Sequence, residues 1–408
     1  MVAGLTADPT SPRPRAGWAH PAVRIAIIYL AARAATTGLF VLAGALSPQG
    51  SRLGPGADLA TYVLAWDAQW YWLIAVEGYP TQLPRTEDGD VAQNAWAFMP
   101  LFPMLARIVG TPLGSWGAGA FLVALAAGYL CCLVLRDVLK DRIGESAALW
   151  AVVFFAAAPI APLLQIGYAE SLFLLFVLLG IRALQRRRYG WLYAIVPLMG
   201  FTRPGVLAFA LLIGLFGIWR LFARRREALR VAEIVHIVAL GALATLIGFA
   251  WPAIAALATG EGDAYFETEL AWRRLWVGDA GAFSPFEGWF QAADFWFTQW
   301  GAGPVVGIAV AVAIVIAIAA LLLFEPHVRR LGVENRLWAA SYVLYLLAVF
   351  FPQSSVFRLL FPLSPLWGAL AVPRSLIWRV GVLVVALAGQ WWWIWNMFGL
   401  GQMFWQIP

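Results

Sequence analysis

The stretch PVVGIAVAVAIVIAIAALLLF, residues 304–324, contains no charged side chain. A helix over this stretch is about 31 Å long, which matches a bilayer hydrocarbon core of about 30 Å. The stretch is also far more apolar than one face of a water-soluble helix requires. It therefore predicts a transmembrane helix.

The composition extends this interpretation to the whole chain. Of its 408 residues, 62% are hydrophobic and 12% are charged. That charged fraction is about half the usual share of a soluble domain, so a water-soluble globule is excluded. The apolar content also excludes a disordered chain. We predict an all-α, polytopic membrane protein.

Further apolar runs predict about 11 transmembrane helices of roughly bilayer-crossing length. Pro197 and Pro204 leave open whether two of these runs, 190–202 and 204–222, form one bent helix. The polar, proline-rich residues 1–21 are expected to be a disordered cytoplasmic N-terminus, followed by one transmembrane domain over residues 22–408. The predicted helices cover residues 22–46, 116–135, 145–162, 167–185, 190–202, 204–222, 232–258, 304–324, 337–352, 357–373 and 379–397.

Short basic clusters between apolar runs predict the orientation of the chain. By the positive-inside rule they face the cytoplasm, so no nucleic-acid partner is expected. The segments 47–115 and 259–303 then lie outside the plasma membrane, are rich in aromatic residues, and are expected to form an active-site platform. The clusters are Arg136/Lys140/Arg142, Arg186–Arg188, Arg224–Arg226 with Arg230, Arg329/Arg330/Arg336 and Arg374/Arg379.

The segment DLATYVLAWDAQWYWLIAVEGY, residues 58–79, contains the leading candidate for catalysis. Its apolar residues recur at helical spacing, which predicts an amphipathic helix lying in the membrane interface. Asp67 falls on the apolar side of that helix, where a carboxylate is costly without a partner or a purpose. Asp67 is either a structural partner of an arginine or a general base at the outer face.

Other polar residues fall near the predicted outer rim of the membrane. Arginines there oppose the positive-inside bias, and they can either bind a lipid phosphate or pair with acidic residues. Glu170 can cap a helix, pair with an arginine or contact a polar substrate. The candidate substrate-binding residues are Trp66, Tyr168, Glu170, Arg203, Arg273 and Arg358.

A carboxylate, rim arginines and an aromatic surface suit one reaction class. A sugar carried on a polyprenyl phosphate is anionic at the membrane surface and apolar below it. Arginines would hold the leaving phosphate, and an aspartate would take the proton of an acceptor hydroxyl. No nucleotide-binding motif or metal-ligand spacing occurs in the sequence, so no cofactor is predicted and dependence on a divalent cation stays open.

Five motif blocks resemble those of the PIG-V-type mannosyltransferases, which belong to the GT-C glycosyltransferases. The chain departs from the usual family pattern at Gln69-Trp70 and Pro204-Gly205. The near absence of lysine beside many arginines is typical of a GC-rich bacterial genome. The blocks are WDAQWYWLIAVEGYP, AFMPLFPMLAR, GYAESLFLLF, FTRPGVLAF and FRLLFPLSP.

The resemblance implies a GT-C-like multi-span fold with interfacial helices in the first outer loop. It also implies a hexosyltransferase that moves mannose from a polyprenyl-phosphate donor with inversion. The catalytic aspartate corresponds to Asp67 and the arginine motifs to Arg203 and Arg358. A bacterial lipoglycan, polysaccharide or secreted protein is the expected acceptor. Two alternatives remain: a transporter or flippase of lipid-linked sugars, and a non-catalytic assembly subunit.

Overall fold

The computed structural model describes residues 20–278, 281–403 and 405–408. Within these ranges the regular elements are helices, apart from one isolated bridge between Arg85 and Val91. The all-α class is therefore confirmed. Residues 1–19 of the predicted disordered N-terminus lie outside the described residues.

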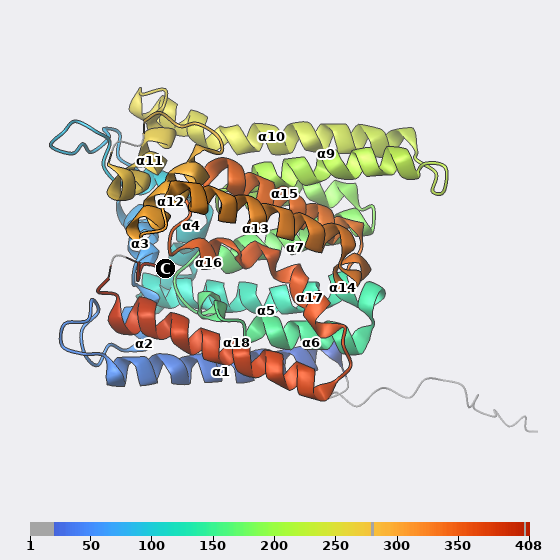
Figure 1. The fold of residues 1–408 in the computed structure, drawn as a ribbon, viewed down its shortest axis with the longest axis horizontal. Coiled ribbons are helices and arrows are strands. Elements are labelled where there is room, and N and C mark those ends of the chain that lie inside the picture. Colours follow the sequence, from blue (N-terminus) through green and yellow to red (C-terminus); the bar gives the residue numbers. More distant parts are fainter. Residues whose placement is uncertain (1–19, 279–280, 404) are drawn as a thin grey trace, which may run out of the picture.

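Six helices of the described chain are long and apolar enough to cross a membrane, so the protein is a multi-pass membrane protein. They lie side by side with their axes roughly aligned (Figure 1). Their bounds are Pro21–Leu46 (α1), Trp116–Ile143 (α5), Val206–Ala223 (α9), Val231–Thr259 (α10), Pro304–Phe324 (α13) and Leu376–Ile394 (α18, continuing to Leu400).

Shorter helices occupy the other five predicted spans, so the number of 11 stays a prediction. The longest of them has 17 residues, or about 26 Å at 1.5 Å per residue. The run 357–373 is broken into three short helical pieces by prolines at 362 and 365. The shorter helices are Glu145–Ala156 (α6), Glu170–Gln185 (α7), Leu192–Gly200 (α8), Val333–Val349 (α15), Val356–Leu359 (α16) and Trp367–Ala371 (α17).

The two segments predicted as outer loops contain helices that gather at one end of the bundle, on the left in Figure 1. Helix α4 directly follows Pro100. These short helices therefore form an ordered layer at this end of the long helices. Its helices are Leu59–Val63 (α2), Asp67–Glu77 (α3), Leu101–Gly110 (α4), Ala264–Val277 (α11) and Glu287–Gln299 (α12).

The prediction of one continuous amphipathic helix over residues 58–79 is wrong. The chain breaks between α2 and α3, where Trp66 adopts φ 58° and ψ −124°. This backbone region is unfavourable for a residue with a side chain, and such strain is concentrated at functional sites. The break makes Asp67 the first residue of α3, where the helix dipole favours a negative charge.

Helix α5 packs on α1, α4, α6 and α7. Small residues allow the close approach of two of these neighbours. A Cβ atom on Gly119 would lie 2.1 Å from the carbonyl oxygen of Ala106 in α4, and one on Gly128 would lie 2.3 Å from the hydroxyl of Tyr29 in α1. Glycine at helix contacts has this role in membrane proteins. The close contact holds α4 against α5, and α4 in turn packs on α3.

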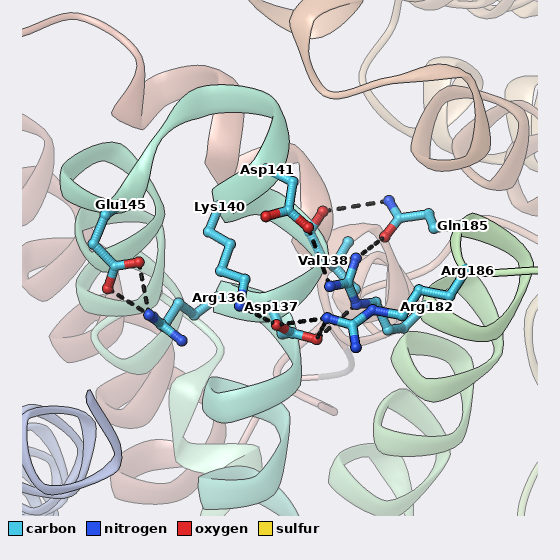
Figure 2. Close-up of polar contacts among 9 residues, drawn as sticks. All are labelled: Arg136, Asp137, Val138, Lys140, Asp141, Glu145, Arg182, Gln185 and Arg186. Carbon is cyan, nitrogen blue, oxygen red and sulfur yellow. Dashed lines mark hydrogen bonds and ion pairs between the residues drawn. The ribbon is translucent and has the colours of Figure 1, made fainter. Parts of the chain in front are cut away.

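The opposite end of the bundle carries the predicted basic clusters. Figure 2 shows Asp137 of α5 between Lys140 and two arginines, Arg182 in the last turn of α7 and Arg186 directly after that helix. The nitrogen–oxygen distances to Lys140 and Arg182 are both 2.6 Å. Ion pairs therefore join the C-terminal ends of α5 and α7. The N-terminal end of α7, which begins at Glu170, lies at the end of the bundle that carries the short helices.

We expect Gly119→Ala to lower the thermal unfolding temperature of the detergent-solubilised protein, because the added methyl group must push α4 away from α5. Overpacking of this kind costs about 1–3 kcal/mol. Gly38→Ala is the matched control, since a Cβ on Gly38 of α1 meets no atom within 4 Å. Equal unfolding temperatures for the two variants would contradict the proposed close contact.

Candidate active site

A cavity of about 560 Å³ opens among the short helices and the adjoining ends of α10 and α15. Its walls combine charged side chains with aromatic rings. Four of its charged residues come from segments that are distant in sequence: Asp67, Arg203, Arg273 and Arg358. The cavity therefore brings together residues that the sequence indicates separately as catalytic or substrate-binding candidates.

Asp67 and Arg358 form an ion pair at the centre of this site. The Oδ2 atom of Asp67 accepts a hydrogen bond from Nη1 of Arg358, and Arg358 lies on the short helix α16. The two side chains are 21% and 12% exposed, so both are largely withdrawn from solvent. Charge-assisted pairs of this kind hold a carboxylate in one orientation.

Glu170 extends the pair into a network of four charged residues. Its Oε1 atom lies 3.4 Å from Nε of Arg358 and 3.3 Å from Nη1 of Arg203. Glu170 begins α7 and is 2% exposed, whereas Arg203 lies in the turn between α8 and α9. Arg358 thus bridges Asp67 and Glu170, and Glu170 bridges Arg358 and Arg203.

Several buried polar atoms of this network lack a hydrogen-bond partner within the described part of the protein. They are Oε2 of Glu170, Nη1 of Arg203, Nε of Arg358 and the hydroxyl of Ser171. Buried polar groups are normally satisfied, so each exception calls for an explanation. Nη1 of Arg203 and Nε of Arg358 both lie within ion-pair distance of Glu170 Oε1, so charge attraction rather than well-aligned hydrogen bonds holds this part of the network.

Two aromatic residues, Tyr168 and Trp66, adjoin Asp67. The Asp67 amide donates to the hydroxyl of Tyr168 over 3.3 Å, and the guanidinium of Arg358 lies 5.3 Å from the Tyr168 ring centre. The indole of Trp66 donates to the carbonyl of Met397 over 2.9 Å. Arg52 stacks 4.5 Å from the Trp66 ring centre and also lines the cavity.

Helix α11 supplies a wall of the cavity that sequence reasoning only partly identified. Arg273 is buried on this wall, and its burial lowers its pKa. The adjacent Arg274 does not line the cavity and pairs instead with Glu267. Sequence reasoning treated the segment as loop, although Tyr265, Glu269 and Arg273 recur every fourth residue.

Glu269 is the functional candidate that the sequence analysis missed. Burial among protein atoms raises its pKa to about 7; a hydrogen bond from Tyr265 and the charge of Arg203 oppose the rise, and the charge of Asp67 adds to it. The side chain is nevertheless open to the cavity.

A second cavity of about 570 Å³ adjoins the charged one, with Gln353 and Ser354 in both walls. It lies between α12, α13, α16 and α18 and is lined almost entirely by apolar side chains, among them Trp296, Ile314 and Trp392. A charged chamber and an apolar chamber are therefore neighbours at the same end of the protein.

Within the described ranges, no group of three or more histidine, cysteine, aspartate or glutamate residues is arranged to hold a metal ion. The acidic loop residues Glu87, Asp88 and Asp90 are exposed and lie on the segment that carries the bridge between Arg85 and Val91.

Comparison with known proteins gives a likeness in structure but none in sequence. No protein-family model and no curated protein matches the sequence. The structure is similar to ArnT from Cupriavidus metallidurans, crystallised with bound undecaprenyl phosphate, at a TM-score of 0.49 and 16% sequence identity. The match covers 90% of this chain and 63% of ArnT, so the chain spans less than two thirds of that protein. Similarity at this level does not assign a function.

We expect Arg358→Gln to destabilise the protein strongly, because it leaves Asp67 and Glu170 without their shared cation. Breaking a buried ion pair costs about 3–5 kcal/mol. Arg24→Gln, at an exposed arginine of α1, is the control. Thermal unfolding in detergent measures both variants. A further test adds Asp67→Asn to Arg358→Gln, and this second change should partly restore stability; strictly additive losses would show that the two residues do not interact.

Proposed function

We propose that the protein is a glycosyltransferase that moves a sugar from a polyprenyl-phosphate donor to an acceptor hydroxyl, with inversion at the sugar carbon. The observation that carries this proposal is the Asp67–Arg358 pair in a charged cavity that adjoins an apolar one. The motif resemblance to PIG-V-type mannosyltransferases supports mannose as the sugar. One transmembrane domain over residues 22–408 would contain the whole site.

The donor's chemistry matches the two chambers. A polyprenyl phosphate has a charged head and a long apolar chain. Arg203, Arg273 and Arg358 line the charged chamber and supply hydrogen-bond donors for a phosphate. The apolar chamber between α13 and α18 offers aromatic and aliphatic walls for the chain. Binding there buries the prenyl chain of the donor, while the phosphate of the donor stays in the charged chamber.

Asp67 is the proposed general base. Its Oδ2 atom is held by Arg358, which leaves Oδ1 for the acceptor hydroxyl. The acceptor oxygen forms a bond to the sugar carbon as its proton passes to Asp67, and the bond between that carbon and the phosphate oxygen breaks. The electron pair leaves with the phosphate, whose added negative charge the arginines stabilise.

The charge distribution supports the predicted orientation. The site lies at one end of the bundle, and the basic clusters terminate helices at the other end (Figure 1). By the positive-inside rule the basic end faces the cytoplasm and the site faces the outer side. An acceptor in the cell envelope, such as a lipoglycan, polysaccharide or secreted protein, would then have access to it.

Asp67→Asn is expected to reduce transfer of radiolabelled mannose from polyprenyl-phosphate-mannose by about 10²–10⁴-fold, the usual contribution of a general base. The assay uses membranes with matched amounts of each protein, and Glu87→Gln, in an exposed loop, is the control. Transfer at the wild-type rate by Asp67→Asn would remove Asp67 as the base. Movement of the donor across the bilayer without transfer would favour the transporter alternative.

Filling the apolar chamber is expected to weaken binding of the donor's chain. Ala311→Trp adds a large side chain from α13 to this chamber. The KM for a long-chain donor should rise, whereas the KM for a short-chain analogue should change little because the short chain does not extend into the chamber. Equal changes for both donors would show that the chain binds elsewhere.

A further inference from the structure

The face of α11 that lines the charged cavity carries a side chain with chemistry unlike that of the arginines. Tyr265, Glu269 and Arg273 follow one another at intervals of four residues, so they lie on one side of the helix. All three line the cavity. Glu269 is thus a carboxylate that faces the same chamber as Asp67 from another wall.

Glu269 differs from the other two carboxylates of the site in its ion-pair partners. Asp67 and Glu170 each pair with arginines. No ion pair within 4 Å involves Glu269 in the ranges that the structure describes, and its neighbour Tyr265 donates the hydrogen bond that it receives. Its remaining lone pairs are open to the cavity.

The chemistry of a carboxylate limits what it binds. A carboxyl group accepts hydrogen bonds from hydroxyl groups, and in its ionised form it repels a phosphate. Hydroxyl groups are therefore its natural ligands. Arg203 and Asp67 act electrostatically on Glu269, so it lies near the groups proposed to hold the phosphate and to receive the proton. The sugar of the donor is the part of the substrate that joins those two places.

Aromatic rings adjoin Glu269 on the same helix. Trp272 lines the cavity, and its ring centre lies 6.1 Å from that of Trp70 and 5.9 Å from that of Phe98. Rings of this kind offer flat apolar surface against which the carbon-bound face of a sugar can pack, while the hydroxyls turn to polar groups.

We propose that Glu269 binds hydroxyl groups of the sugar being transferred, with Trp272 packing beside it, and so distinguishes a sugar-bearing lipid phosphate from the bare lipid phosphate. This inference rests on the proposed function of the site. It makes Glu269 a substrate-binding residue that determines specificity. The role as base remains with Asp67.

Binding in lipid nanodiscs tests the inference without the need for an acceptor. The probes are polyprenyl phosphate and polyprenyl-phosphate-mannose, titrated separately against the full chain and followed by tryptophan fluorescence. Glu269→Gln is expected to weaken binding of the mannose-bearing lipid by about 10- to 100-fold, as loss of a charged hydrogen-bond acceptor predicts. Its affinity for polyprenyl phosphate should stay at or rise above the wild-type value, because the repulsion between the carboxylate and the phosphate is lost.

Two further variants make the result specific. Glu267→Gln removes a carboxylate two residues away that pairs with Arg274 and does not line the cavity, so it should leave both affinities unchanged. Glu269→Asp keeps the charge and should retain part of the preference. A Glu269→Gln protein that still prefers the mannose-bearing lipid would overturn the role of Glu269 alone. A wild-type protein that binds neither lipid would overturn the proposed function as well.

Discussion

The ion pair between Asp67 and Arg358 is the interaction on which the organisation of this end of the protein depends. It joins residues 291 positions apart. Withdrawing two charges from water is costly unless they meet each other and further polar partners. Glu170 and Arg203 provide those partners. The network therefore requires four separate segments to arrive at one place, and a fold that failed to bring them together would leave buried charges uncompensated.

The helices meet this requirement by placing each charge at a helix terminus or turn. Asp67 and Glu170 are the first residues of α3 and α7, where exposed backbone N–H groups favour carboxylates. Arg203 lies in a turn, and Arg358 is on a helix of one turn. The glycine contacts of α5 bring α4 close, and the ion pairs at the opposite end anchor α7. Rigid packing thus supports a polar centre that is itself incompletely hydrogen-bonded.

Much of this arrangement could be predicted from the sequence, because hydrophobic runs and charge clusters are local signals. The helical class and the positions of the long helices follow from such runs, as residues 304–324 show. Charged residues near the membrane are costly without a partner or a function. The sequence therefore indicates four candidates: Asp67, Glu170, Arg203 and Arg358. Their pairing was only one of several alternatives, since it depends on packing between distant helices.

The remaining features depend on information that is not local. The break at Trp66 is a strained backbone conformation imposed by tertiary contacts, and periodicity alone predicts a continuous helix there. Helices α11 and α12 were treated as loop because their polar and aromatic residues do not resemble a membrane span. Glu269 was missed for the same reason: its significance comes from the cavity it faces.

The most direct test of the central claim is a structure of the protein in lipid nanodiscs with polyprenyl phosphate, determined by electron cryomicroscopy. The account predicts phosphate density within hydrogen-bond distance of Arg203, Arg273 or Arg358, beside Asp67. The prenyl chain should extend between α13 and α18 into the apolar chamber. A lipid phosphate bound elsewhere, with the charged cavity filled only by water, would contradict the claim that these two chambers form one donor site.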